Sequence, residues 1–116
     1  MVGRFARQWV GETLESDTDT YGKYLDETGI KEIKATKGNH GVWLLRRLHE
    51  GRAEFIVISI WDSLASVKAF AGHEYEKAVY YPEDKKFLLN LNLHVSHYEV
   101  LVCSTASDRR GTISGL

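Results

Sequence analysis

The sequence contains only one cysteine, Cys103, among its 116 residues. A single cysteine excludes a disulfide bond within the chain and any zinc site built from several cysteines. No apolar run approaches the roughly 20 residues that a membrane-spanning helix needs. Residues 1–12 carry charge too early and too often for a secretory signal peptide. We therefore expect a cytoplasmic protein with no membrane partner.

Charge of one sign is also lacking, because the formal net charge is -1. A balanced chain gives no reason to expect nucleic acid or an anionic membrane as a partner. The glycines of residues 37–41 lack the spacing of a nucleotide-binding loop, and no nucleophile elbow is present. The histidines lack the spacing of a helical metal pair. We expect no metal and no nucleotide.

The composition is otherwise that of a soluble globular protein, with 43% hydrophobic and 27% charged residues. The length suggests one domain. We expect this domain to span residues 1–102. Residues 103–116 are polar and small and lack periodicity, so we expect a flexible C-terminal tail.

Periodicity predicts six main elements along the chain. Strands are expected over 2–11, 42–50, 54–61 and 93–102. A helix is expected from Ser16–Thr18 until Gly29 ends or bends it, and a second over 63–72, capped by Asp62 or Ser63. A short further helix is expected over 74–81, where Pro82 closes it or opens another turn. Gly51 supplies the turn of a hairpin.

This βαββαβ order predicts a ferredoxin-like α+β fold, with a four-stranded antiparallel sheet and helices on one face. Such a sheet leaves its second face uncovered. Ile56, Ile58 and Ile60 point to one side of their strand, and Ser59 and Trp61 to the other, so both faces carry large apolar side chains. Each such side chain left in water forgoes roughly 1.5–3 kcal/mol. A second copy of the sheet would cover them, so we expect a homodimer.

We assign different roles to the two faces. The isoleucine face is expected to pack under the helices. The mixed face includes Phe55, Val57, Ser59 and Trp61, and on the other strands Arg7, Trp9, Trp43, Arg47, His97 and Glu99. Aromatic side chains with a few converging polar groups are the usual composition of a ligand site.

The segments "RQWVGE", "GNHGVWLLRR", "FIVISIWDS", "AFAG" and "HYEV" resemble the antibiotic-biosynthesis-monooxygenase (ABM) family of dimeric α+β barrel proteins. The resemblance covers roughly residues 3–102. It implies a small homodimer with one pocket per subunit, between sheet and helices. Members of this family include cofactor-independent monooxygenases acting on aromatic polyketides, and haem-degrading enzymes.

The haem-degrading branch carries an asparagine on the first strand, a tryptophan in the helix after the third strand and a haem-ligating histidine nine or ten residues later. Alignment through "WDSLASVKAF" places Phe70 at the tryptophan position. Val79 or Tyr80 takes the histidine position, and Arg7 lies near the asparagine position. His73 is the nearest histidine, shifted by about two helical turns. The resemblance therefore disfavours haem.

Four residues of the mixed face each have two interpretations. Trp61 either plugs the core or lines a pocket, and Ser59 is either a small filler or a hydrogen-bond donor to a ligand. Arg7 either pairs with a carboxylate such as Glu99 or binds an anionic oxygen of a ligand. His97 is either a hydrogen-bonded structural group or a general base, because its unperturbed pKa lies near neutral pH.

The function that we expect is the oxygenation of a small aromatic or polyketide-like molecule by O2, without metal or organic cofactor. His97 would be the base or proton relay, and Arg7 would stabilise the substrate anion. The substrate-binding residues would be Trp61, Ser59, Trp9, Trp43, Phe70, Tyr80 and His73. The alternatives are a non-oxidative cyclase or isomerase using the same pocket, and a dimer that binds haem or another small ligand.

Overall fold

The computed structural model describes residues 4–104. Its strands are β1 (Phe5–Leu14), β2 (Asn39–His49), β3 (Arg52–Trp61) and β4 (Ser96–Glu99). Its helices are α1 (Thr18–Leu25), α2 (Lys31–Ala35), α3 (Leu64–Ala71) and α4 (Asp84–Phe87). A 3-10 turn (Glu15–Asp17) precedes α1, and a π-helical turn (Asp26–Ile30) joins α1 to α2. The predicted tail lies outside the described residues from position 105 onward.

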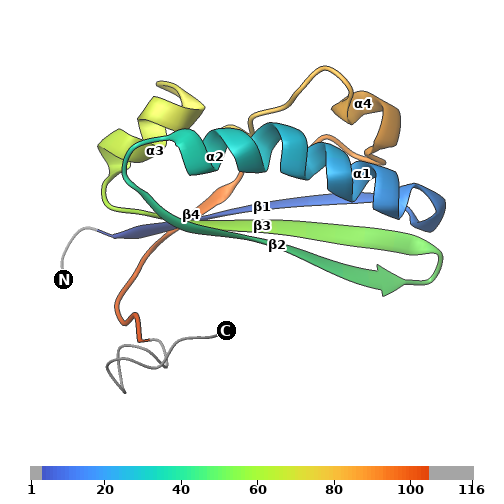
Figure 1. Ribbon diagram of the computed structural model, residues 1–116, viewed down its shortest axis with the longest axis horizontal. Helices are drawn as coiled ribbons and strands as arrows, with labels where there is room; N and C mark the ends of the chain where they lie inside the picture. Colours follow the sequence, from blue (N-terminus) through green and yellow to red (C-terminus); the bar gives the residue numbers. More distant parts are fainter. Residues whose placement is uncertain (1–3, 105–116) are drawn as a thin grey trace.

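The four strands form one antiparallel sheet in the order β2-β3-β1-β4. Two consecutive strands, β2 and β3, form a hairpin, and the helical segments connect the other strands. This topology confirms the ferredoxin-like α+β fold. All of the helices lie on one face of the sheet, with α3 near the α2 end and α4 near the α1 end of the continuous helical segment that α1 and α2 form (Figure 1). None of the helices between residues 4 and 104 has both the length and the hydropathy that crossing a bilayer requires.

Local sequence signals fix the turns at both ends of β3. The β2–β3 hairpin closes with Glu50 and Gly51, whose φ angles of 50° and 80° are the positive values that a tight hairpin turn needs. At the other end, Ser63 caps α3, because its hydroxyl accepts a hydrogen bond from the Ser66 backbone N–H at 3.1 Å. Gly72, with φ of 91°, follows the last turn of α3. These features confirm the predicted hairpin and helix.

The first helix does not end at Gly29, as one of our two expectations had it. The chain stays helical to Ala35, and Gly29 lies inside the π-helical turn. Thr28 donates its hydroxyl hydrogen to the Tyr24 carbonyl at 2.8 Å across this turn, which supplies a partner for a backbone oxygen. Ile30 and Ile33 are buried beyond the turn, so tertiary packing sustains the helix past its glycine.

Several predicted element bounds were wrong, and one predicted helix is not formed; β2 begins at Asn39 rather than at residue 42. The first strand is Phe5–Leu14 rather than 2–11, and the last is Ser96–Glu99 rather than 93–102. Residues 74–81 form no helix; this segment has irregular backbone with an isolated bridge between Lys77 and His94. Pro82 precedes the short helix α4, which agrees with the alternative that it opens another turn. Irregular backbone is stable here because the Arg7 side chain donates hydrogen bonds to the Tyr75 and Lys77 carbonyls.

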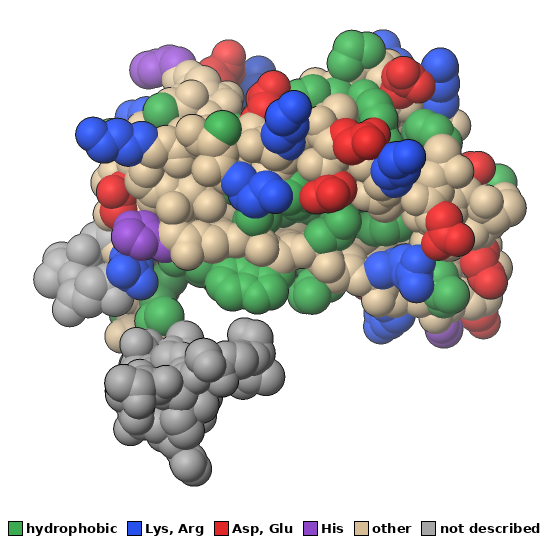
Figure 2. All heavy atoms as spheres, in the orientation of Figure 1, with side chains coloured by type: hydrophobic (Ala, Val, Ile, Leu, Met, Phe, Trp, Pro, Cys, Tyr) green, Lys and Arg blue, Asp and Glu red, His purple; other side chains and the backbone are tan. Residues whose placement is uncertain are grey.

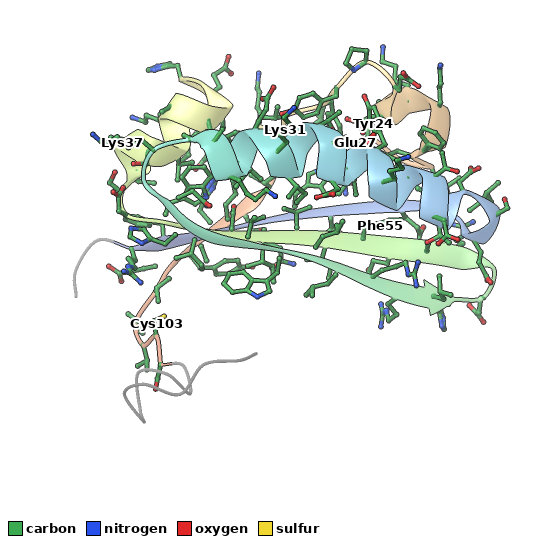
Figure 3. The ribbon with its side chains drawn as sticks, viewed as in Figure 1. Tyr24, Glu27, Lys31, Lys37, Phe55 and Cys103 are labelled. Atoms are coloured by element: carbon green, nitrogen blue, oxygen red, sulfur yellow. The ribbon has the colours of Figure 1, made fainter. Side chains whose placement is uncertain are left out.

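The assignment of the two sheet faces was also wrong. The residues of β3 that point toward the helices are Ala53, Phe55, Val57, Ser59 and Trp61, all buried. The isoleucines face the open side and are partly exposed. The mixed face can be buried because its polar atoms satisfy one another: the Trp61 indole N–H donates to Ser59 Oγ at 2.8 Å. The rings of this face, such as Phe55, fill the layer between sheet and helices (Figure 3).

The open face of the sheet is mostly apolar over its central part and carries charged residues, Glu12, Arg47 and Glu54, toward the β2–β3 hairpin. Register places on it the side chains of Ala6, Val10, Trp43, Leu45, Ile56, Ile58, Ile60 and Tyr98. Figure 2 shows hydrophobic side chains gathered along the lower edge of the molecule, on the side of the sheet away from the helices. Trp43 is 52% exposed and Tyr98 53%. An apolar surface of this kind is typical of an interaction site.

Candidate functional site

A cavity of about 50 Å³ lies between the covered face of the sheet and the helices. Its lining comes from β1, β3, α1, α2 and the π-helical turn between them, α3, the irregular segment before α4, and α4 itself. Most of this lining is apolar. The polar side chains at the cavity are Arg7, Ser59, Tyr81 and Asp84. The place of the cavity agrees with the pocket between sheet and helices that the family resemblance implied.

Arg7 is the cation of this site and is only 4% exposed. Its guanidinium donates to the carbonyl oxygens of Tyr75 and, at 3.1 Å, of Lys77. Among the described residues no carboxylate pairs with it. Burial lowers the pKa of Arg7 to about 10, so the side chain remains charged at neutral pH. Arg7 therefore does not pair with Glu99, which we had considered, and its charge is held in place by backbone.

His97 lies next to Arg7, on β4, and its Nε2 atom is 3.1 Å from Arg7 Nη1. The pKa of His97 is lowered, first by burial and then by the Arg7 charge, while Glu76 opposes the shift. His97 is therefore neutral at pH 7, and its Nε2 accepts a hydrogen bond from the guanidinium. His97 does not line the cavity. Its position allows it to act on a ligand only through Arg7.

Trp61 belongs to the core, because it is 0% exposed and does not line the cavity. Its ring stacks on Phe70, with centroids 5.7 Å apart and planes at 26°. The Arg7 guanidinium lies over the Phe70 ring, with its Cζ atom 5.7 Å from the ring centroid. Phe70, unlike Trp61, lines the cavity. Phe70 and Arg7 therefore form one wall of the cavity, and Trp61 packs behind Phe70 and supports it.

Trp9 forms the centre of the cavity floor, opposite Val57 on β3. Its ring lies over Gly11: a Cβ atom at position 11 would collide with the indole and come within 2.9 Å of Leu88 Cδ2. The Trp9 indole N–H is buried and makes no hydrogen bond with the described residues. Burial raises the pKa of the neighbouring Tyr80 hydroxyl, and the Trp9 indole N–H opposes this shift without reaching hydrogen-bond geometry.

Asp84 is the residue of this site that the sequence analysis missed. It is 2% exposed and lines the cavity. Tyr21 donates its hydroxyl hydrogen to Asp84 Oδ1 at 2.8 Å, and the Tyr81 backbone N–H donates to Oδ2 at 2.6 Å. Burial, and then the Asp84 hydrogen bond and charge, raise the pKa of Tyr21. An acidic residue soon after a proline is typical of an exposed helix start. The sequence therefore offers no reason to expect that Asp84 is buried.

Three predicted residues lie elsewhere. Trp43 pairs with Ile58 and so belongs to the open face of the sheet. His73 is exposed, in a separate surface cleft that Glu76 and His94 also line. Tyr80 packs edge-on against Trp9 with ring centroids 6.4 Å apart, but its hydroxyl donates to the Asn92 carbonyl, away from the cavity. The structure thus brings together Arg7, Trp9, Ser59 and Phe70, with His97, Trp61 and Tyr80 behind them.

No protein-family model matches the sequence, and neither does any curated protein. Solved structures do match the fold. A candidate antibiotic biosynthesis monooxygenase from Bacillus cereus superposes with a TM-score of 0.64 at 17% identity, covering 90% of this chain and 100% of its own. A protein of unknown function from Nitrosomonas europaea gives 0.65 at 14% identity, with 88% and 93% covered.

A haem-degrading protein from Mycobacterium tuberculosis also matches, with a TM-score of 0.50 at 14% identity, covering 90% of this chain and 100% of its own. At such identities the likeness establishes the fold alone. The chain therefore has the fold shared by ABM-like proteins, and the chemistry of its site has to be argued from its own residues.

Proposed function

We propose that this protein is a cofactor-independent monooxygenase that oxygenates a small, electron-rich aromatic molecule in the cavity between sheet and helices. The observation that carries the proposal is Arg7, a buried cation without a carboxylate partner among the described residues, at the wall of an apolar cavity. A fixed positive charge in a site of low polarity stabilises an anion far better than water does.

The chemistry requires a phenol or a carbonyl compound that can ionise. Its anion carries electron density onto a ring or methylene carbon, and this carbon transfers electrons to O2 and forms a C–O bond. The resulting peroxide takes up a proton, which replaces the one that the substrate released on ionisation. The hydroperoxide then loses water together with the remaining hydrogen of that carbon, so that one oxygen atom remains as a carbonyl. The substrate supplies all of the electrons, and the protein positions it, stabilises its anion and excludes water.

In this proposal Arg7 binds the ionised oxygen, while His97 positions Arg7. Neutral His97 accepts a hydrogen bond from the guanidinium and has no access to the cavity, which argues against the role of general base that we had considered first. Phe70 and Trp9 supply the apolar walls against which a ring would pack. Ser59 Oγ already accepts from Trp61, so its own hydroxyl hydrogen is the part available to a ligand.

Ligand binding would enlarge the cavity. Its volume of about 50 Å³ is smaller than the ~150 Å³ cavity that holds benzene. The side chain best placed to move is Tyr81, on the irregular segment before α4, whose ring lies over Gly29 and whose hydroxyl donates to Glu32 at the surface, at 2.7 Å. Outward rotation of Tyr81 would lengthen the cavity without disturbing the sheet.

The working unit in our proposal is a homodimer. The apolar open face described above would pack against the same face of a second copy related by two-fold symmetry. Such packing would complete a dimeric α+β barrel and remove Trp43 and Tyr98 from water. The segment that follows β4 leaves the sheet on this same side, so it would also lie near the second copy (Figure 1).

Haem does not fit the site. No histidine lines the cavity, and His97 Nε2 is engaged by Arg7. Phe70, stacked on Trp61, fills the space beside the sheet. We therefore derive no step that involves haem.

Oxygen consumption tests the proposal, using a panel of phenols and ketones that runs from 1-naphthol to anthrone. We expect enzyme-dependent O2 uptake with at least one member, and the quinone or ketone as product. Arg7→Gln should lower the rate by about 10–100-fold, since a hydrogen bond to a charged group contributes ~1.5–3 kcal/mol. The control is Arg52→Gln, whose side chain pairs with Glu12 far from the cavity. Conversion without O2 uptake would indicate the non-oxidative cyclase or isomerase instead.

A further inference from the structure

Asp84 is a buried carboxylate that the proposed chemistry does not use. It opens α4, and its side chain points into the layer between sheet and helices, where it lines the cavity. Its two oxygens accept one hydrogen bond each, from the Tyr21 hydroxyl and the Tyr81 backbone N–H. A carboxylate has about four acceptor positions, so two of them remain for another donor.

No cation neutralises this carboxylate within residues 4–104, where every ion pair lies at the surface and none includes Asp84. Burying an anion with only neutral donors is costly, and proteins usually add further hydrogen bonds to compensate. Because Asp84 lines the cavity, a ligand there can reach its carboxylate. A ligand that carries a donor would supply the missing bond.

Asp84 and Arg7 lie at different ends of the cavity. Leu88, directly after α4, sits over Gly11, whereas Phe70 of α3 sits over Arg7. Positions 7 and 11 are four residues apart on β1, which corresponds to about 13 Å along the strand. The paired residues Trp9 and Val57 occupy the middle. The site therefore has a positive end and a negative end separated by an apolar centre.

We propose that Asp84 is the specificity-determining residue of this site, selecting an aromatic ligand that carries a hydroxyl or N–H donor at one end and a carbonyl or ionised oxygen at the other. The donor binds the open side of the Asp84 carboxylate, and the oxygen binds Arg7. This inference rests on the proposed function in so far as the cavity takes a small molecule. It adds which polar groups the molecule carries and how it is oriented between Asp84 and Arg7, neither of which the oxidative chemistry alone defines.

Tyr21 provides the control that separates ligand selection from a purely structural role. Its hydroxyl bond to Asp84 links α1 to α4, and the Tyr21 ring packs against Phe55, 5.3 Å away between centroids. Tyr21→Phe removes this link but leaves the carboxylate and its charge at the cavity. Asp84→Asn removes the charge while an amide oxygen remains to accept from Tyr21. Asp84→Asn also leaves one of the two donors to this side chain without an acceptor, so stability does not separate the two roles. The ligand preference does: a structural role leaves it unchanged in both variants, and ligand selection changes it only in Asp84→Asn.

The experiment is isothermal titration calorimetry of the full chain with 4-hydroxybenzaldehyde and 4-methoxybenzaldehyde, which share the carbonyl and differ in the donor. The wild-type protein should bind the hydroxyl compound about 10–100-fold more tightly, as expected for a hydrogen bond to a charged acceptor. Asp84→Asn should reduce this ratio to below about threefold. Tyr21→Phe should keep the wild-type ratio even if its melting temperature falls.

Three outcomes would overturn the inference. Equal affinities of the wild-type protein for both aldehydes would do so and leave the proposed function intact. A ratio unchanged by Asp84→Asn would assign the donor preference to another residue. Absence of binding by either aldehyde would overturn the inference and the small-molecule site together. Asp84→Ser serves as a second variant if Asp84→Asn does not fold, and the wild-type ratio requires no variant.

Discussion

Arg7 on β1 and His97 on β4 are directly paired across the sheet, and a hydrogen bond of 3.1 Å joins the guanidinium to the imidazole. A cation and a histidine in contact would repel each other if both were charged. The histidine is therefore kept neutral, by burial first and by Arg7 second. The pKa of His97 is therefore lower in the folded protein than in the unfolded chain, and this difference makes stability depend on pH.

The first prediction concerns pH. Because the pKa of His97 is lowered in the folded protein, the unfolded chain binds more protons between that lowered pKa and about 6.5. The free energy of unfolding should therefore fall as pH decreases through this window. His97→Gln should flatten the dependence. Urea unfolding between pH 5 and 7.5 measures it, with exposed His94→Gln as control; an equal slope in wild type and His97→Gln would contradict the assignment.

The second prediction concerns the buried pair Ser59 and Trp61. Ser59→Ala leaves the Trp61 indole N–H without an acceptor in a fully buried position, which should lower the free energy of unfolding by about 1–3 kcal/mol. Ser66→Ala removes a partly exposed hydroxyl whose partner Asp62 remains open to water, and should cost less. Chemical denaturation compares the two variants. Equal, small losses would mean that the indole finds another partner once Ser59 is gone.

The third prediction concerns Gly11, over which the Trp9 ring packs closely. Gly11→Ala forces the indole and Leu88 to move, and such overpacking typically costs about 1–3 kcal/mol. Ligand affinity should fall as well, because Trp9 forms the cavity floor. The matched control is Gly22→Ala in α1, where the added methyl group meets Phe55 at an ordinary 3.6 Å and the helix gains up to ~1 kcal/mol. Stability and ligand titrations of both variants decide whether the close approach at Gly11 matters.

The fourth prediction concerns the open face. Ile58 lies near its centre, between Trp43 and Gln8 on the neighbouring strands. Ile58→Glu should convert a dimer into a monomer, because a carboxylate would be buried without a partner at the interface. Ala35→Glu adds the same charge on the exposed helical side and should leave the assembly unchanged. Analytical ultracentrifugation gives the masses; a monomeric wild-type protein would remove the homodimer from our proposal.

The strands, their hairpin and the ferredoxin-like topology could be predicted from alternation and from Gly51, because both act over a few residues. Alternation also grouped Arg7, Ser59 and His97 on one face, as the register has them. It is symmetric, however, and does not indicate which face the helices cover. The Trp61–Ser59 hydrogen bond decides this point, since it lets the mixed face be buried without an unsatisfied polar group.

Trp43 was wrongly assigned to the mixed face, although the hairpin turn contains the information needed to assign it correctly. A two-residue turn at Glu50 and Gly51 pairs His49 with Arg52, and counting back along β2 from this pair places Trp43 opposite Ile58. The hairpin turn alone thus places Trp43 on the same face as Ile58, whichever face the helices cover. Asp84 offered no comparable signal, because its burial depends on Tyr21, which lies 63 residues earlier in the chain.

The π-helical turn has a consequence for how this chain should be compared with others. Buried positions of an unbroken α-helix recur every three or four residues, yet Leu25 and Ile30 are five apart. The wider turn absorbs one surplus residue and keeps Ile30 and Ile33 in line with Leu25 over the cavity. A chain lacking one residue between 26 and 29 would keep the same buried stripe in an ordinary α-helix. An alignment gap of one residue at this point therefore indicates a change from a π-helical to an α-helical turn, while the buried residues of the helix stay the same.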